Sequence, residues 1–139
     1  MKTLKILAPV FALGMALSGA AHADDLMDAR TAADTATKIR QVTYQCTTGG
    51  KVAVKFGFNK QNLPTFAEAH LGGKTRFLPI NLAHSDIAST SFGDENSWTI
   101  GSSAMTLANY HKSDILVMNP NAVIEHKYCK VTNVKKLKG

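Results

Sequence analysis

The segment from residue 42 to residue 59 constrains the fold more than any other part of the chain. Its apolar side chains fall on alternate positions over residues 42–46 and again over residues 52–58. A period of two is typical of strands that bury one face and expose the other. Gly49 and Gly50 lie between the two arms, and a Gly-Gly pair suits a tight hairpin turn. The segment therefore predicts two antiparallel strands joined at their ends.

Short segments of the same kind follow along the rest of the chain, and Gly, Asn, Asp or Pro separates most of them. Beyond the hairpin they cover residues 65–71, 75–82, 89–93, 98–102, 115–118 and 122–130. Together with the hairpin they make eight short strands, and no segment has the apolar stripe of a long helix. The pattern predicts an all-β domain, either an antiparallel barrel or a sandwich.

The first residues have the composition of a secretory signal peptide. Two lysines precede an apolar run over residues 6–17, and Ala21 and Ala23 supply small side chains at the cleavage positions. We therefore predict a signal peptide at residues 1–23 and export to the periplasm or the outer-membrane surface. The apolar run is shorter than the roughly 20 residues that a membrane span needs, and no other segment approaches that length. The mature chain is predicted to have no transmembrane segment.

The remaining chain divides into an arm, one domain and a tail. Residues 24–38 are rich in Ala, Asp and Thr with few apolar positions, which predicts a flexible N-terminal arm. The barrel domain is assigned to residues 39–131. Residues 132–139 contain three lysines and few apolar side chains, so they are predicted to form a basic tail outside the core. The formal net charge is +6, and it falls to +4 without the signal peptide, which contains two lysines and no acid.

The chain has two cysteines, Cys46 in the hairpin and Cys129 near the C-terminus. In an exported protein two cysteines most economically form one disulfide, and closing so long a loop stabilises the folded state by about 4 kcal/mol. Two unrelated thiols are the alternative. Cys129 alternates in phase with Glu125 and Lys127, so a disulfide requires either a bulge in the last strand or a position at the end of the barrel.

Catalytic and metal-binding patterns are weak. The mature chain has histidines at positions 70, 84, 111 and 126, and none has the close spacing of a metal-binding pair. A site formed by His126 and Cys129 would need a free thiolate. Acidic pairs occur only as neighbours in sequence, and no Gly-x-Ser-x-Gly nucleophile motif is present. The sequence predicts a protein that is not an enzyme and has no metal or cofactor.

The lysines near the C-terminus raise the question of a polyanionic partner. Lys127, Lys130 and the tail lysines could contact phosphates or acidic polymers, and a solvated terminus is the alternative. Nucleic-acid binding would need aromatic side chains interleaved among the lysines for stacking. Tyr128 is the only aromatic residue nearby, and its alternation with Ile124 and His126 favours the core. No nucleic-acid partner is therefore predicted.

A dense group of short polar side chains lies between residues 85 and 103. It includes Ser85-Asp86, the run from Ser89 to Ser91, the turn from Gly93 to Ser97, and Gly101-Ser102-Ser103. Presented by a stiff barrel, such loops suit recognition of a polar cleft on another macromolecule. Ordinary turn chemistry explains the same composition equally well, because Ser, Asp, Asn and Gly fill turns in any protein.

Several of these segments together resemble a known family. They are Val42-Thr43-Tyr44-Gln45-Cys46, the run from Lys51 to Lys60 with its Gly-Phe-Asn-Lys end, Leu78-Pro79-Ile80-Asn81-Leu82, Ser85-Asp86, Phe92-Gly93 and the late Cys129. In this combination the chain is similar to the adhesin complex protein family of Gram-negative envelopes over nearly all of the mature domain. That family is related to the periplasmic and membrane-bound inhibitors of c-type lysozyme, which share the Tyr-x-Cys start.

The resemblance implies a small eight-stranded antiparallel β-barrel with one disulfide. It also implies a protein that binds and blocks host c-type lysozyme, and adhesion to the host cell surface or surface display is also reported for the family. The related inhibitors insert a Ser-Gly-x-x-Tyr loop into the enzyme's cleft, helped by a lysine on a following strand. Here the nearest segment is residues 89–93, with Phe92 at the place of the tyrosine and Ile100 near that of the lysine.

We therefore place the lysozyme contacts in the polar loops. Hydroxyl groups can donate hydrogen bonds to the enzyme's catalytic carboxyl groups, and acidic side chains can meet arginines at the rim of its cleft. The predicted binding residues are Ser85, Asp86, Ser89, Thr90, Phe92, Asp94, Glu95, Asn96, Ser102 and Ser103. Because lysozyme is itself basic, a chain with a positive net charge gains no overall electrostatic steering toward it. The alternative function is a surface adhesin or a small-ligand-binding barrel that leaves lysozyme active.

Overall fold

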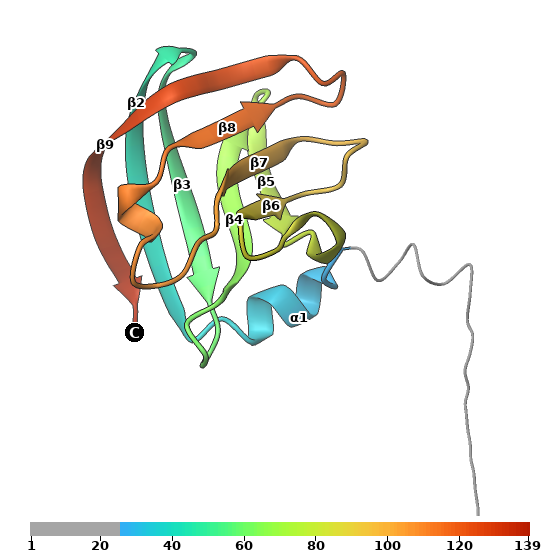
Figure 1. The fold of residues 1–139 in the computed structure, drawn as a ribbon, viewed down its shortest axis with the longest axis vertical. Coiled ribbons are helices and arrows are strands. Elements are labelled where there is room, and N and C mark those ends of the chain that lie inside the picture. The colour runs from blue at the N-terminus through green and yellow to red at the C-terminus, as the bar shows by residue number, and fades with distance from the viewer. Residues whose placement is uncertain (1–25) are drawn as a thin grey trace, which may run out of the picture.

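The computed structural model describes residues 26–139, and the predicted signal peptide at residues 1–23 lies outside the described residues. One short helix and eight strands make up the described chain (Figure 1). In chain order they are α1 (Ala29–Asp34), β2 (Lys38–Thr48), β3 (Gly50–Phe58), β4 (Pro64–Leu71), β5 (Lys74–Pro79), β6 (Ser89–Phe92), β7 (Thr99–Ser103), β8 (Ile115–Met118) and β9 (Ile124–Lys138). Two 3₁₀ turns, η3 (Leu82–His84) and η4 (Tyr110–Lys112), lie in the connections before β6 and after β7.

The eight strands form one antiparallel sheet in the order β5-β4-β3-β2-β9-β8-β7-β6, which curls into a nearly closed barrel (Figure 1). The two edge strands meet at one end, where Ile80 forms a bridge with Phe92. There the Asn81 amide donates a 2.7 Å hydrogen bond to the Ser91 carbonyl. The predicted all-β fold, an eight-stranded antiparallel barrel, is confirmed.

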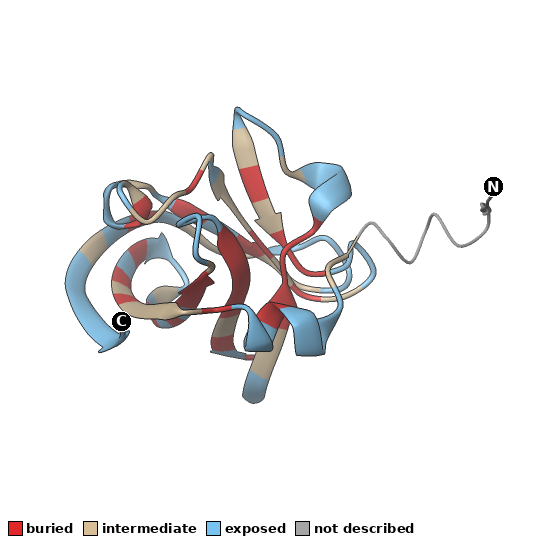
Figure 2. Cartoon of the chain, turned by 90° about the horizontal axis from the view of Figure 1, so that it is seen from below, coloured by how far each residue is buried: buried red, intermediate tan, exposed pale blue. Residues whose placement is uncertain are grey.

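The β2–β3 hairpin supplies much of the core. Val42 pairs with Val54, and Cys46 pairs with Gly50 at the turn. Directly paired side chains share one face of a sheet, and here that face points into the barrel, where buried residues gather (Figure 2). The largest fully buried side chains of this core belong to Tyr44, Phe56, Phe58, Phe92 and Ile100. The period of two in the hairpin sequence is therefore the period of burial.

Within the predicted flexible arm at residues 24–38, Ala29–Asp34 form the helix α1 and Lys38 begins β2. Asp28 caps α1 by accepting a 3.0 Å hydrogen bond from the Thr31 amide. Ala32 is fully buried in a small cluster with Phe66, and its carbonyl accepts a 2.9 Å hydrogen bond from the buried Thr65 hydroxyl. The structure differs from the prediction because alanine lets a helix approach β4 closely, so no wide apolar stripe is needed to hold it.

The predicted basic tail at residues 132–139 is also part of the sheet, since β9 extends to Lys138. Val134 pairs with Val42, and Lys138 pairs with Ile39, so the pairing with β2 continues almost to the C-terminus. The Arg40 guanidinium donates a 2.7 Å hydrogen bond to the Lys138 carbonyl. Strand pairing uses backbone groups, which are the same whatever the side chains, and β2 offers an edge along this whole length. The lysines therefore lie on a strand and stay exposed there (Figure 2).

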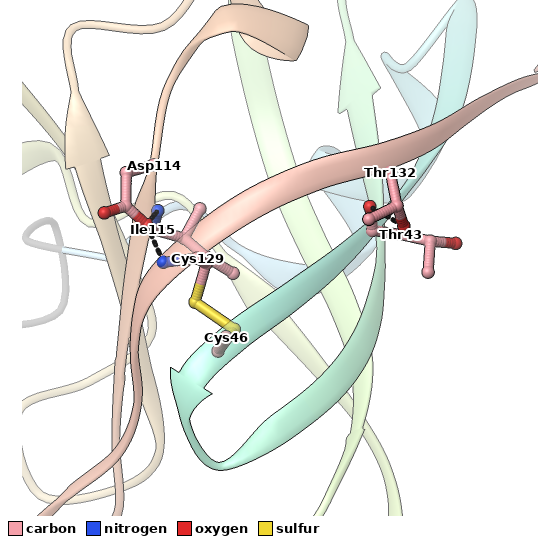
Figure 3. The surroundings of a disulfide bond; sticks show 6 residues. All are labelled: Thr43, Cys46, Asp114, Ile115, Cys129 and Thr132. Carbon is pink, nitrogen blue, oxygen red and sulfur yellow. Dashed lines mark hydrogen bonds between the residues drawn. A yellow bond between two sulfur atoms is a disulfide. The ribbon is translucent and has the colours of Figure 1, made fainter.

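Cys46 and Cys129 form the predicted disulfide, and the two residues are paired across β2 and β9 (Figure 3). Tyr128 has a φ of 55°, and this change of backbone direction turns Cys129 into the core and Tyr128 outward. Tyr128 is 65% exposed, so its predicted core position is wrong, whereas the predicted irregularity of the last strand is present. The Asp114 carboxylate accepts hydrogen bonds from the Cys129 amide at 2.8 Å and the Ile115 amide at 2.7 Å, which joins β8 to β9 here.

Candidate binding surface

A groove of about 430 Å³ runs beside the β6–β7 hairpin, between η3 and the β8–β9 turn. Four of the ten predicted binding residues line it, namely Ser89, Thr90, Glu95 and Ser102. Antiparallel pairing brings them together, because Thr90 pairs with Ser102 across the hairpin. The structure therefore gathers side chains from two sequence segments at one groove, although Thr90 itself is buried and accepts a 2.9 Å hydrogen bond from the Met105 amide.

The connection of residues 82–88, which begins with η3 and leads into β6, is held in shape by hydrogen bonds of its own side chains. Ser85 accepts a 3.0 Å hydrogen bond from the Ser91 amide. The Asp86 carboxylate accepts hydrogen bonds from the Ala88 amide at 2.7 Å and from the Ser89 amide at 2.9 Å. These backbone hydrogen bonds hold the pKa of the exposed Asp86 carboxyl below its usual value, because they favour the charged form. Ser85 and Asp86 thus fix the shape of the loop.

Ile87, at the tip of this connection, is the feature that sequence reasoning missed. It is 99% exposed, although isoleucine is among the residues most often buried. Leu82 and Leu63 beside it are 51% and 50% exposed, and all three line a second depression of about 520 Å³. The available signal was a single β-branched apolar residue within a stretch of polar loop residues.

The remaining predicted residues divide between the turn and the core. Asp94 and Asn96 are exposed in the β6–β7 turn, where the Asp94 carboxylate accepts a 2.9 Å hydrogen bond from the Asn96 amide. Ser103 is exposed, and its hydroxyl lies 3.0 Å from that of Ser113. Phe92 is fully buried against Phe56, with the ring centroids 5.7 Å apart. Its side chain is part of the core and cannot take the surface role expected of it.

An ion pair spans the groove between two connections. His84 Nε2 lies 3.6 Å from a carboxylate oxygen of Glu95, and both side chains are mostly exposed. Exposed pairs of this kind contribute little to stability. Its main effect is to place a protonatable group of η3 beside the acidic β6–β7 turn.

Charge is unevenly distributed along the chain. Between Arg76 and Lys112 there are three acidic residues, Asp86, Asp94 and Glu95, and no lysine or arginine. All three acids are exposed and lie in the connections before and after β6. We call the connection 82–88, the turn 93–98 and the groove beside them the loop surface. It is locally negative although the chain as a whole is positive.

Two further findings bear on the chemistry of residues 26–139. Within this range no three His, Cys, Asp or Glu side chains are placed to hold a metal ion together. In the same part of the chain, no helix has the length and apolar character needed to span a bilayer.

The fold and this surface define a class of small disulfide-closed antiparallel barrels with a rim of loops beside one groove. The ACP-like domain family model matches residues 40–131, and the chain belongs to this family. Among solved structures it is similar to the Adhesin Complex Protein from Neisseria meningitidis, at 38% sequence identity and a TM-score of 0.62. That similarity covers 66% of this chain and 98% of the Neisseria chain. A search of curated proteins gave no match.

Proposed function

We propose that this protein is a non-catalytic binding protein that inhibits host c-type lysozyme with its loop surface. The main support is the braced connection 82–88, which holds Ile87 fully exposed beside the groove. The chain belongs to the ACP-like family, and the resemblance of its sequence to the related lysozyme inhibitors is the reason for choosing c-type lysozyme as the enzyme. Export to the periplasm or the bacterial surface belongs to the same proposal, because that is where host lysozyme is met.

Blocking a cleft requires a surface that projects into it. The connection 82–88 projects, and hydrogen bonds to Asp86 and Ser85 fix its shape before binding, which lowers the entropy lost on association. Ile87 and Leu82 are exposed at this projection, and an aliphatic side chain that enters a pocket is a common anchor of a protein interface. The groove alongside leaves room for one wall of the enzyme's cleft.

Polar groups around the anchor provide specificity. Ser89 and Ser102 line the groove, where a hydroxyl group can donate to the carboxyl pair of a glycosidase; Ser102 must first release its 2.7 Å hydrogen bond to the Ser103 carbonyl. Asp94 and Glu95 lie at the edge, where they can meet arginines of a basic enzyme. Asp86 has a different role, because its carboxylate is already bonded to the backbone.

Local charge also favours a basic partner. The loop surface has three acids and no lysine or arginine, so it attracts a basic enzyme even though the whole chain is positive. Association should therefore be faster at low ionic strength, because exposed charges are screened by salt. The positive net charge alone predicts no electrostatic steering toward lysozyme, and the local negative charge of the loop surface supplies the attraction instead.

Adhesion at the host cell surface is a second candidate function. The name of the Neisseria relative describes an adhesin complex protein, and the exposed apolar group of Leu63, Leu82 and Ile87 is available for a protein partner. An adhesin that is not an inhibitor would bind host cells and leave lysozyme active.

A titration of c-type lysozyme on cell-wall substrate tests the main proposal. Activity should fall with added protein and reach its minimum near one inhibitor per enzyme. Undiminished activity at a large excess of the protein would refute lysozyme inhibition and favour the adhesin.

Two variants locate the contact. Ile87→Asp should raise the inhibition constant by roughly tenfold or more, as expected for an interface anchor. Leu137→Asp is the matched control, since Leu137 is an exposed leucine on β9, outside the loop surface, and it should inhibit like the unmodified protein. Asp94→Lys combined with Glu95→Lys should also weaken inhibition. Equal inhibition by Ile87→Asp and Leu137→Asp would remove the connection 82–88 from the contact.

A further inference from the structure

A basic wall lies on β9, β2 and β3, which are neighbours in the sheet and lie on the left of the barrel in Figure 1. These three strands have nine basic residues and one acid, Glu125. The basic residues are Lys38, Arg40, Lys51, Lys55, Lys127, Lys130, Lys135, Lys136 and Lys138. So strong a bias on adjacent strands is not a property of the whole chain, which contains ten acids.

Strand register arranges four of these lysines as a rectangle on the outer face. Gln45 pairs with Lys51 on one side and Lys130 on the other. Gln41 pairs in the same way with Lys55 and Lys135. Since the alternate residues of β2 point into the core, both rows point to solvent. Lysines within a row are two strands apart, roughly 10 Å, and the rows are four residues apart on β3, roughly 13 Å.

The side chains between the two rows of lysines are short and mostly polar. Thr43 pairs with Ala53 and Asn133 between the two rows, and Gln41 and Gln45 lie within the rows themselves. Amide and hydroxyl groups can exchange hydrogen bonds with a hydroxyl-rich ligand. No tryptophan, phenylalanine, tyrosine or leucine occupies the paired positions of the rectangle, so the rectangle itself has no apolar wedge like that of a membrane-surface protein. Tyr128 is the one exposed aromatic residue on these three strands and lies outside the rectangle, so there is no series of aromatic side chains on which bases of single-stranded nucleic acids could stack.

Most of this charge is not neutralised within residues 26–139. Lys55 lies 4.0 Å from Glu68 on β4, and the one other ion pair of the described chain joins His84 to Glu95. Lys51, Lys130 and Lys135 therefore have no described carboxylate within salt-bridge distance. Like charges held this close repel one another, and a polyanion that bridges them relieves the repulsion.

We propose that the basic wall binds a linear polyanionic glycan, a polysaccharide with sulfate or carboxylate groups. An extended chain can lie across the rectangle, with its anionic groups at the four lysines and its hydroxyl groups over Thr43 and Asn133. The spacing of the four lysines and the polar side chains between them fit an anionic polysaccharide better than a lipid bilayer. A polysaccharide offers hydroxyl groups to the amide side chains, whereas a bilayer surface does not. The wall is separate from the loop surface, so glycan binding does not depend on lysozyme inhibition.

Chromatography on immobilised heparin, used as a sulfated glycan, tests this inference. The variant Lys51→Gln, Lys130→Gln, Lys135→Gln removes three corners of the rectangle. Lys60→Gln, Lys74→Gln, Lys112→Gln is the control, since it removes the same charge from exposed positions off the wall. The wall variant should bind heparin roughly tenfold more weakly, and its slope of log affinity against log salt should fall by roughly 2 to 3. The control variant should keep most of the affinity and of the slope.

Three outcomes would overturn the inference. Equal losses in the wall and control variants would mean that only net charge matters. Retention by the unmodified protein no stronger than on uncharged dextran would mean that no polyanion is bound. Binding to phosphatidylglycerol vesicles without binding to heparin would assign the wall to a membrane surface. Because all six lysines are exposed, both variants should unfold at the temperature of the unmodified protein, which shows that any loss is one of binding.

Discussion

Removing the disulfide should lower stability strongly and leave the binding surface in place. Cys46 and Cys129 are 83 residues apart in sequence, and the chain-entropy model gives about 4 to 5 kcal/mol for a crosslink of that length. A domain of this size has a free energy of unfolding of roughly 5 to 15 kcal/mol, so the disulfide contributes a large share of it. The crosslink restricts the unfolded chain more than it shapes the folded one, because the β2–β9 pairing already places the two residues together.

Urea unfolding of three samples measures this effect. Reduced protein keeps both sulfur atoms and isolates the crosslink, so its free energy of unfolding should fall by about 4 to 5 kcal/mol. The variant Cys46→Ala, Cys129→Ala should lose about 1 kcal/mol more, because both side chains are buried. The m-value should rise in both samples, since an unfolded chain without the crosslink exposes more surface.

Lysozyme inhibition completes the test. Under conditions where the reduced protein is folded, inhibition should match that of the oxidised protein, because the loop surface is built by β6, β7 and η3. A loss of stability below about 1 kcal/mol on reduction would refute the entropic account of the crosslink. Loss of inhibition by a protein that is still folded would refute the separation of the crosslink from the binding surface.

Three further predictions concern single residues. Burial, followed by the charge of Asp114, raises the pKa of the Tyr44 hydroxyl, so stability should be full below about pH 10 and fall above it as the unfolded chain ionises first. Since this buried hydroxyl has no hydrogen-bond partner in the described chain, Tyr44→Phe should stabilise by about 1 kcal/mol and reduce the alkaline loss, as measured by urea unfolding at several pH values. Gly49→Ala should lower the thermal midpoint of unfolding far more than Gly50→Ala. Both glycines have a positive φ, so both substitutions strain the backbone. A Cβ on Gly49 would also collide with the backbone of β9, whereas a Cβ on Gly50 would meet nothing within 4 Å. Asp86→Ala should weaken lysozyme inhibition with little change in thermal midpoint, because it releases an exposed loop, and an unchanged inhibition constant would contradict the bracing role.

The hairpin shows what a sequence predicts well. Val42, Tyr44 and Val54 are buried, whereas the residues next to them in sequence are intermediate or exposed, so the period of two in the sequence matches the side that faces the core. Because side chains alternate strictly along a strand, a shift of one residue in the pairing would expose every buried side chain, so the register of the two strands is fixed. The short turn fixes which residues pair. The disulfide was predicted on other grounds, namely two cysteines in an exported chain, because alternation alone placed Cys129 in phase with Glu125 and Lys127.

Tertiary packing decided the parts that the sequence did not predict. Alternation in β9 is broken by the positive φ of Tyr128 and by a register shift near Thr43, so its apolar residues do not form one visible stripe. α1 uses Ala32 as its main buried contact, and alanine gives too weak a hydropathy signal to reveal that. Ile87 was missed for a different reason: a side chain that is 99% exposed takes no part in the periodic burial of the described chain, so hydropathy periodicity does not reveal it.

The division of charge is consistent with the two proposed kinds of partner. Acidic residues without lysine or arginine occupy the connections around β6, whereas three adjacent strands on the wall of the barrel have nine basic residues and one acid. At physiological ionic strength charges are screened beyond about 8 Å, so each surface acts locally and the net charge of the chain describes neither. A basic protein can dock at the loop surface while a polyanion occupies the wall. An inhibitor that also holds an anionic polysaccharide would be concentrated on a glycan-covered surface, where a basic enzyme such as lysozyme is also attracted.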